Sequence, residues 1–296
     1  MKRFIITSHG WSASNWLAFA LNSHEDIVCT HSARNILANR QDMNSDRSLR
    51  ENLLQLHQGY VSRQLESLEE KYAKIESLGR GSVYGSVHVL RLRDLPYLWE
   101  RFGAPSQGYE VMNLVRHPVS LVWSGYGQFR TLFRYDINEL HWTLGKVLRE
   151  DKEYVLETAL KYDFYPGDLE NLAFIGASVV LGSLRMDLDA EEEVPALQGV
   201  NYKKVVRMER VTTDPGELDR VVREISDSQC RASRSYLENV YKAGIVNEHK
   251  KDRNKTDAAR RYMMFSPWQK EVFNHFFEKY NLRRAYEAYG YDFSFL

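Results

Sequence analysis

Short apolar runs separated by amphipathic stretches dominate the first part of the chain. Phe4-Ile5-Ile6 leads through a turn of small residues into the amphipathic stretch 15–21, and 26–30 is a short β-branched run. The first pattern is typical of a strand followed by a helix, and the second is typical of another strand. Strand, helix and strand predict a βαβ opening. With the elements below, they predict an α/β fold in a single domain over residues 1–296, with a short, mainly parallel sheet surrounded by many helices.

The remaining elements follow from the same two periodicities. Apolar residues at helical spacing among many charges predict a long helix over 46–77, and alternation over 82–89 predicts a strand. The run 110–115 has the composition of a buried strand. The acidic run 187–193 is interpreted as a solvated loop or a helix end. A strand is also predicted over 203–208, and helices are predicted over 92–102, 119–132, 137–160, 168–184, 217–225, 266–280 and 282–288.

The charge balance limits the kinds of partner. Lys and Arg together number 40, Asp and Glu together number 40, and the formal net charge is +0. Proteins that bind nucleic acid or membrane surfaces without selectivity usually carry a basic face that makes the whole domain basic. The sequence therefore predicts no nucleic-acid partner and no membrane partner, and any phosphate site must be local.

Cysteine usage and the first residues bear on the compartment. Cys29 and Cys230 lie far apart and form no CxxC pattern, so neither a disulfide framework nor a zinc cluster is indicated, and no metal is expected. The sequence enters its first strand without the pattern of a signal peptide, and no apolar run approaches the roughly 18 residues of a membrane span. We expect a cytoplasmic protein.

The turn between the first strand and the first helix is a candidate anion site. The first backbone N–H groups of a helix have no intrahelical partner and carry the positive end of the helix dipole, so they attract phosphate or sulfate. The turn has no Lys or Arg and lacks the pattern GxxxxGKS or GxxxxGKT, so it is not a standard nucleoside triphosphate loop. An ordinary turn with Ser14 as N-cap is the alternative. The candidate ligand residues are Gly10, Trp11, Ser12, Ala13, Ser14 and Asn15.

A second candidate anion site follows the strand predicted over 110–115. Arg116 comes directly after this strand, and Ser124 stands eight residues later. If the chain turns from the strand end into a helix, the guanidinium and the hydroxyl can converge on one phosphate, and Arg suits such forked recognition. The alternative is a surface arginine and a helical serine that faces solvent.

These motifs and their order resemble the nucleotide-dependent sulfotransferase family, whose members use 3′-phosphoadenylyl sulfate (PAPS). Residues 12–17, followed by 22–24, are similar to the family's 5′-phosphosulfate loop, and 116–126 is similar to its 3′-phosphate motif. Residues 206–215 resemble its strand-Tyr-Glu-Asp-Leu segment, and 266–273 resembles its C-terminal helix. The matches are spread over most of the chain in the family's order.

The resemblance implies the sulfotransferase fold, which is similar to that of P-loop nucleoside triphosphatases. It implies transfer of a sulfuryl group from PAPS to a hydroxyl or amine of a small-molecule or glycan acceptor, with the desulfated nucleotide (PAP) as the second product. By this resemblance, residues 10–14 would hold the 5′ end of the nucleotide, and Arg116 and Ser124 would hold its 3′-phosphate.

Trp11 departs from the family pattern, because the family carries Lys or Arg at this position. In the family, that cation stabilises the charge that develops on the bridging oxygen during transfer. Its replacement by Trp11 therefore calls catalysis into question and leaves nucleotide binding compatible with the sequence. The best alternative supplier of a cation is the run 249–261, where the family has a basic loop that closes over the 3′-phosphate. The alternative interpretation of the run 249–261 is a solvated charged loop without a ligand. The candidate ligands in this run are Lys250, Lys251 and Arg253.

Histidines are the candidates for proton transfer, because the ordinary pKa of imidazole lies near neutrality. His88 follows the strand predicted over 82–89, where many members of the family place their catalytic histidine. His9 stands beside the candidate anion turn and could replace the missing cation when protonated. A structural or surface role is the alternative for both. His117 is interpreted as part of the turn that follows Arg116.

Two other classes of function compete with the transferase. A non-catalytic relative that binds PAP or a sulfated ligand would also explain Trp11. A small-molecule kinase is disfavoured, because the turn lacks both the loop Lys and the Mg²⁺-binding Ser or Thr that follows it. Four aromatic residues could line a site but are more typical of core: Trp16, Tyr262, Phe265 and Trp268.

Overall fold

The described part of the chain divides into two compact units. The first, called the sheet unit, comprises Met1–Val115 and Asp189–Lys251, and the second, called the helical unit, comprises Arg116–Leu188 and Asp252–Leu296. The single domain expected over the whole chain stays a prediction. The computed structural model describes residues 1–31, 35–36, 67–77, 81–203, 205–243 and 257–296.

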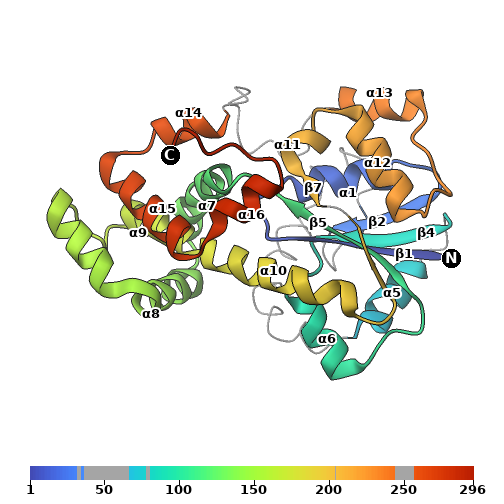
Figure 1. The fold of residues 1–296 in the computed structure, drawn as a ribbon, viewed down its shortest axis with the longest axis horizontal. Coiled ribbons are helices and arrows are strands. Elements are labelled where there is room, and N and C mark those ends of the chain that lie inside the picture. The colour runs from blue at the N-terminus through green and yellow to red at the C-terminus, as the bar shows by residue number, and fades with distance from the viewer. Residues whose placement is uncertain (32–34, 37–66, 78–80, 204, 244–256) are drawn as a thin grey trace. The chain divides into compact units, whose positions relative to one another are not determined.

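The sheet unit is built on one sheet whose strands run mainly in parallel (Figure 1). Its strands are β1 (Lys2–Ser8), β2 (Ile27–His31), β3 (Asn35–Ile36), β4 (Val83–Val87), β5 (Tyr109–Val115), β6 (Val200–Tyr202) and β7 (Val206–Arg207). Their order is β3-β2-β4-β1-β5-β6, and β7 also pairs with β5. The pairing is parallel throughout except between β2 and β3. This topology confirms the predicted α/β fold with a mainly parallel sheet.

The two faces of β1 explain how the sheet is covered. Successive side chains of a strand point to opposite faces, so Phe4 and Ile6 join one apolar cluster and Ile5 joins the other. The first cluster is closed by α1 (Ser14–Asn22), α12 (Pro215–Ile225) and α13 (Arg234–Lys242), which Figure 1 shows above the strands. The second is closed by α5 (Leu68–Glu76) and α6 (Asp94–Phe102) below them.

One close approach fixes the spacing of β1 and β4. Gly85 on β4 lies opposite Phe4 on β1 in the parallel register. A Cβ atom at Gly85 would overlap the Phe4 ring, and Phe4 is fully buried. Glycine therefore allows the aromatic ring to lie over the β4 backbone and to fill the core.

The strand order places a change of direction at the carboxyl end of β1. From β1 the chain passes through α1 to β2 on one side, whereas β5 lies on the other side of β1. Open α/β sheets bind ligands in the crevice that such a switch creates outside the carboxyl ends of the strands. Ser8 lies opposite Leu114, so β1 and β5 end at the same edge of the sheet. The turn after β1 therefore occupies the position expected for a ligand site.

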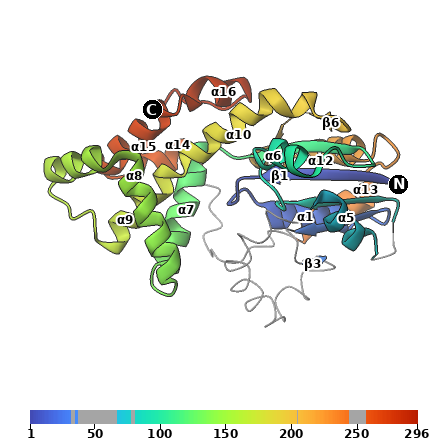
Figure 2. The same cartoon turned by 90° about the horizontal axis from the view of Figure 1, so that it is seen from below.

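The helical unit is organised around α9 (Leu169–Val179), whose residues 172–179 are buried. Figure 2 labels α9 together with α7 (Pro118–Leu132) and α8 (Ile137–Tyr162), which pack against it. Phe174 packs edge-on against Phe265 and Trp268, with ring centroids 4.9 Å and 5.4 Å apart. Burial of Trp16, Tyr262 and Phe265 confirms the interpretation of these three aromatic candidates as core, whereas Trp268 is only partly buried. The other helices of this unit are α14 (Ala258–Met263), α15 (Pro267–Lys279) and α16 (Leu282–Ala288).

Several predicted elements differ in extent from the structure. The helix predicted over 168–184 breaks at Val180, and α10 (Leu181–Glu193) carries the acidic run as a helix end. The strand predicted over 203–208 is wrong in extent, because β7 is short and α11 (Met208–Val211) follows it at once. Helices α13 and α14 were not predicted. Of the helix predicted over 46–77, only the part containing α5 lies within the described residues.

A segment of the chain is apolar and long enough to cross a membrane. The helical segment Leu169–Ala196 has 28 residues and a window of mean hydropathy 1.2, and 67% of that window is buried inside the structure. By length and composition, the expectation that no stretch approaches a membrane span is therefore wrong. A buried core helix of a soluble protein has the same properties, so the segment is weak evidence for a span.

Candidate anion-binding and catalytic site

The turn between β1 and α1 has an unusual backbone. Gly10 has a φ of 95°, and the non-glycine residues Trp11 and Ala13 have φ of 52° and 53°. Left-handed residues followed by helical ones turn successive N–H groups toward one side and form concave anion sites. Such conformations are costly for residues with a Cβ atom and cluster at functional sites. The backbone of the turn thus favours anion binding.

The start of α1 lacks the usual local cap. Its N-cap residue is Ala13, so the alternative with Ser14 as N-cap is wrong. The N-cap residue Ala13 makes no side-chain hydrogen bond, and the first turn of α1 contains no acidic residue. The positive end of the α1 dipole therefore has no carboxylate from its own first turn beside it. Asn15 occupies the second position of this helix.

The two predicted hydroxyl ligands of the turn have different surroundings. Ser12 Oγ donates to the carbonyl oxygen of Gly10 at 2.9 Å, so this hydroxyl stabilises the turn itself. Ser14 Oγ lies 3.0 Å from Nε2 of His31. Both serines are buried. Ser14 is thus the hydroxyl that links the turn to a side chain from another strand.

The imidazole of His88 is fixed against the same turn. Its Nδ1 lies 3.0 Å from the carbonyl oxygen of Ser8. A carbonyl oxygen only accepts, so Nδ1 carries the hydrogen and Nε2 carries the lone pair of the neutral ring. A Cβ atom at Gly10 would lie 3.3 Å from His88 Cε1 and 3.8 Å from Nε2, so this edge of the ring packs against the turn. In this neutral tautomer, Nε2 is the ring nitrogen that can accept a proton.

His31 is a site residue that the sequence analysis missed. It is the last residue of β2, it contacts Ser14, and its ring stacks on His88 with centroids 5.4 Å apart and an interplanar angle of 26°. In the sequence it marks only the end of a predicted strand. The parallel pairing of β2 with β4 brings it beside His88, because His31 lies opposite Val87. Only the strand order could have revealed this contact.

His9 lies in the turn between β1 and α1, beside Trp11. Its ring lies 6.3 Å from the ring of Trp11, with an interplanar angle of 51°, and the side chain is half-buried. His9 is therefore an aromatic neighbour of Trp11. Trp11 stands where the family resemblance places a cation. The role of His9 as a replacement cation stays a prediction.

In the helical unit, Arg116 and Ser124 meet as their spacing predicts. Arg116 Nη1 donates to Ser124 Oγ at 2.7 Å, and both side chains are partly exposed. Pro118 at the first position of α7 and the preceding extended residue His117 turn the chain from the strand end into the helix. Ser124 is therefore hydrogen-bonded to Arg116 and only partly exposed, unlike the helical serine of the alternative. A hydroxyl that accepts from Arg116 still has a proton to donate, so both groups can serve one anion.

His117 is part of this turn, as the sequence analysis interpreted it. Its Nδ1 accepts from the backbone N–H of Val119 at 3.2 Å, so the neutral ring carries its hydrogen on Nε2. That nitrogen lies 3.2 Å from the carbonyl oxygen of Asp292. Aromatic rings of Phe293 and Phe295 pack against it with centroids 4.7 Å and 5.8 Å away. The buried imidazole thus holds the start of α7 against the C-terminal segment of the same unit.

The basic candidates of the C-terminal run are placed only in part. Lys250, Lys251 and Arg253 lie outside the described residues. Arg260 and Arg261 lie in α14, whose N-cap Asp257 accepts from the backbone N–H of Arg260 at 2.7 Å. The proposed closure of this run over a phosphate stays a prediction.

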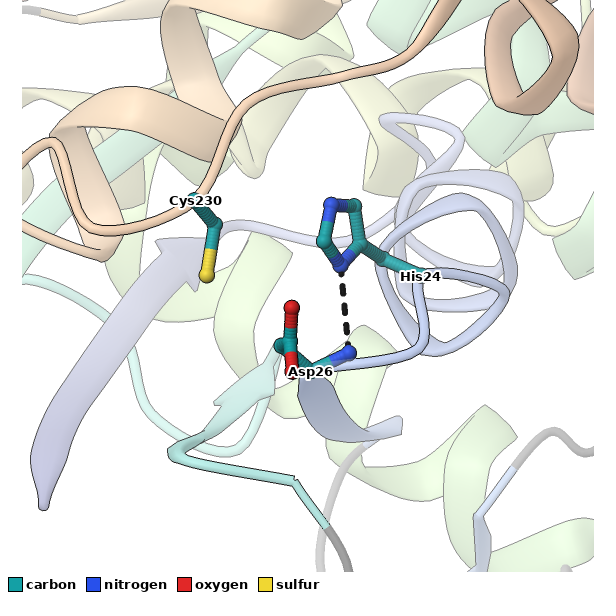
Figure 3. Close-up of side chains that lie close together, drawn as sticks. All are labelled: His24, Asp26 and Cys230. Carbon is teal, nitrogen blue, oxygen red and sulfur yellow. Dashed lines mark hydrogen bonds between the residues drawn. The ribbon is translucent and has the colours of Figure 1, made fainter.

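A cluster of His24, Asp26 and Cys230 lies in the sheet unit, with ligand-type atoms within 4.8 Å of one another (Figure 3). His24 Nδ1 accepts the backbone N–H of Asp26 at 3.2 Å, and Nε2 lies 3.1 Å from the carbonyl oxygen of Arg231. Both ring nitrogens therefore have backbone partners. Burial and the nearby Asp26 carboxylate raise the pKa of the Cys230 thiol, which disfavours a thiolate ligand. We assign no metal to this cluster.

Comparison with known proteins gives a structural likeness. No protein-family model matches the chain, and no curated protein matches it. Among solved structures, the chain is similar to a crystal structure of mouse sulfotransferase SULT7A1 complexed with PAP, with 13% sequence identity and a TM-score of 0.45. The likeness covers 98% of this chain and 88% of that chain. Because the identity and the TM-score are this low, the roles proposed below rest on the geometry of this chain's own residues.

Proposed function

We propose that this chain is a sulfotransferase that transfers a sulfuryl group from PAPS to a hydroxyl or amine of a small-molecule or glycan acceptor. The observation that carries the proposal is the position of His88, whose ring is oriented by Ser8 and packs against Gly10 of the turn before α1. A base with its lone pair at an anion site suits group transfer from an anionic donor to a protic acceptor.

Each of two sets of residues, taken by itself, offers groups that suit one anionic end of the donor. The amides of residues 10–15, with the Ser14 hydroxyl, offer the 5′ end a helix start with no acidic residue in its first turn. Arg116 and Ser124, 2.7 Å apart, offer the 3′-phosphate a guanidinium and a hydroxyl. The segment containing Lys250, Lys251 and Arg253 would add positive charge over that phosphate, as the family resemblance implies.

Proton transfer is the task of His88 in this proposal. PAPS supplies a sulfuryl group: the acceptor oxygen or nitrogen bonds to sulfur while the bond from sulfur to the bridging phosphate oxygen breaks, and PAP leaves with that electron pair. His88 Nε2 takes the proton that the acceptor loses and becomes an imidazolium. Its Nδ1–H bond to the Ser8 carbonyl stabilises this cation. Because Trp11 carries no charge, the helix amides and the imidazoles must stabilise the developing negative charge.

Binding is tested by calorimetry with PAP and with ATP on the full chain. We expect PAP to bind more tightly than ATP, and Arg116→Ala to weaken PAP binding about tenfold or more through lost charge-assisted hydrogen bonds. The matched control is Arg130→Ala on α7, the helix that follows Arg116 and carries Ser124, because Arg130 pairs with Glu170 at 2.7 Å and is half-exposed. Preferential ATP binding, or equal effects of the two variants, would contradict the proposal.

Catalysis is tested by labelled sulfate transfer to phenols, alcohols, sugars and amines. We expect His88→Ala to lower turnover while leaving the affinity for PAP nearly unchanged, because the base does not hold the nucleotide. An equal loss of turnover and PAP affinity would show that His88 is structural.

A non-catalytic binder of PAP or of a sulfated ligand is the second candidate. The observation that favours it is Trp11, which stands in the turn where the family resemblance places a cation. PAP binding without transfer to any acceptor in the screen would select this alternative.

A further inference from the structure

His31 connects the start of α1 with His88. Its Nε2 lies 3.0 Å from Ser14 Oγ, and its ring stacks on His88 at 5.4 Å. Ser14 is the first residue of α1 and is buried, so this contact is made at the start of the helix. Resting on the sulfotransferase function proposed above, we infer that His31 is a positioning residue that directs the Ser14 hydroxyl toward the sulfate end of the donor and holds the ring of His88.

The direction of the hydrogen bond between Ser14 and His31 follows from which of their groups can donate a proton. A serine hydroxyl has one proton to donate and lone pairs that accept. When an anion lies on the first amides of α1, Ser14 donates its proton to the anion, because a sulfate or phosphate oxygen only accepts. Ser14 Oγ then accepts from His31, so His31 carries a hydrogen on Nε2. Anion binding thus selects the forms of His31 that carry a hydrogen on Nε2, which are the Nε2–H tautomer and the imidazolium.

The stacking couples the two imidazoles. Two positive rings in contact repel, so the protonation of one ring lowers the tendency of the other to protonate. Burial raises the pKa of the Cys29 thiol on β2, so this neighbour stays neutral. Helix α1 carries no ionisable side chain. The other ionisable groups on β4 and on the segment between β4 and α6 are Tyr84, Arg91 and Arg93, with Asp94 at the start of α6.

The first experiment follows the imidazoles by NMR titration of the full chain without any ligand. We expect His31→Gln to raise the titration midpoint of His88 by about half a pH unit or more, because a neighbouring cation is removed. Ser14→Ala should shift the midpoint of His31. Exposed His141 in the helical unit serves as the internal reference that does not move. Midpoints of His88 and His31 that stay unchanged in these variants would overturn the inference.

The second experiment measures PAP and inorganic sulfate binding by calorimetry. His31→Ala should weaken both ligands about tenfold, because the hydrogen bond to Ser14 is lost. His31→Gln should retain most of the affinity, because its amide N–H can still donate to Ser14. In the Ser14→Ala background, His31→Ala should cost little more, since the two residues act through one bond.

The outcomes separate positioning from a structural role and from failure of the proposed function. Equal losses in His31→Gln and His31→Ala, or additive losses with Ser14→Ala, would overturn the inference. If the wild-type chain binds no PAP, the sulfotransferase proposal fails. The ligand-free titration then decides alone whether His31 is coupled to Ser14 and His88, and an uncoupled result overturns the inference as well.

Discussion

Gly10→Ala perturbs the proposed catalytic centre through a single methyl group. Gly10 has a φ of 95°, a conformation that L-residues rarely adopt. The new Cβ atom would lie 3.3 Å from Cε1 of His88, which is tighter than ordinary van der Waals contact. The His88 ring cannot retreat freely, because it is held by the Ser8 carbonyl at 3.0 Å and by the stacked ring of His31. The substitution therefore adds backbone strain and displaces the imidazole.

The two contributions have different magnitudes and different readouts. Left-handed strain on an L-residue costs about 1–2 kcal/mol of stability. A base displaced by a few tenths of an ångström loses its alignment with the acceptor, and we expect turnover to fall about tenfold. Stability is measured by hydrogen exchange of peptides from β1 and β5 in urea, and turnover is measured by labelled sulfate transfer.

Gly103→Ala is the matched control. Gly103 has a φ of 79° and ends α6, but a Cβ atom there would meet nothing within 4 Å among the described residues. Its substitution should cost about 1–3 kcal/mol of stability from the backbone alone and leave turnover per folded molecule unchanged. If Gly10→Ala destabilises the protein but leaves turnover and the NMR signals of His88 as in wild type, the packing of His88 on the turn is refuted.

Two further predictions concern the units separately. Gly85→Ala should destabilise the sheet unit by about 1–3 kcal/mol, because its Cβ atom overlaps the buried Phe4 ring, and an unchanged urea midpoint would contradict this packing. Burial would raise the pKa of Asp151, but hydrogen bonds from His275 at 2.6 Å and Lys279 at 3.1 Å hold it below its ordinary value. A carboxyl group whose pKa is lower in the folded protein than in the unfolded chain stabilises the fold at pH values above its unfolded pKa. This stabilisation is lost as the pH falls through the folded pKa. Stability should therefore drop below about pH 4, and less so in Asp151→Asn; identical acid profiles would refute the pairing.

The strands and the main helices could be predicted because their signals are local. The apolar runs 4–6 and 110–115 became β1 and β5, and the Asp-Pro-Gly start before 217–225 became the cap of α12. The contact between Arg116 and Ser124 was also predictable, since a strand end and a helix start fix eight residues of chain. In each case the geometry depends on neighbours in sequence.

The remaining features depend on contacts between distant segments. His31 and His88 are 57 residues apart (88 − 31), and only the pairing of β2 with β4 brings their rings together. The break at Val180 interrupts an apolar stretch that has helical spacing on both sides. Close by, a Cβ atom at Gly182 would lie 2.7 Å from the ring of Tyr280, which no local pattern reveals. Sequence periodicity therefore predicts elements more reliably than the site that they assemble.

Helix α1 is anchored along its sides, since eight of its nine residues are buried, and its N-cap residue adds no side-chain hydrogen bond. A helix held in this way keeps its first turn ordered, so the first amides of the helix are in place before any ligand arrives. Recognition would then cost little ordering entropy, and an acidic side chain introduced at position 13 would act as a built-in competitor for the same amides.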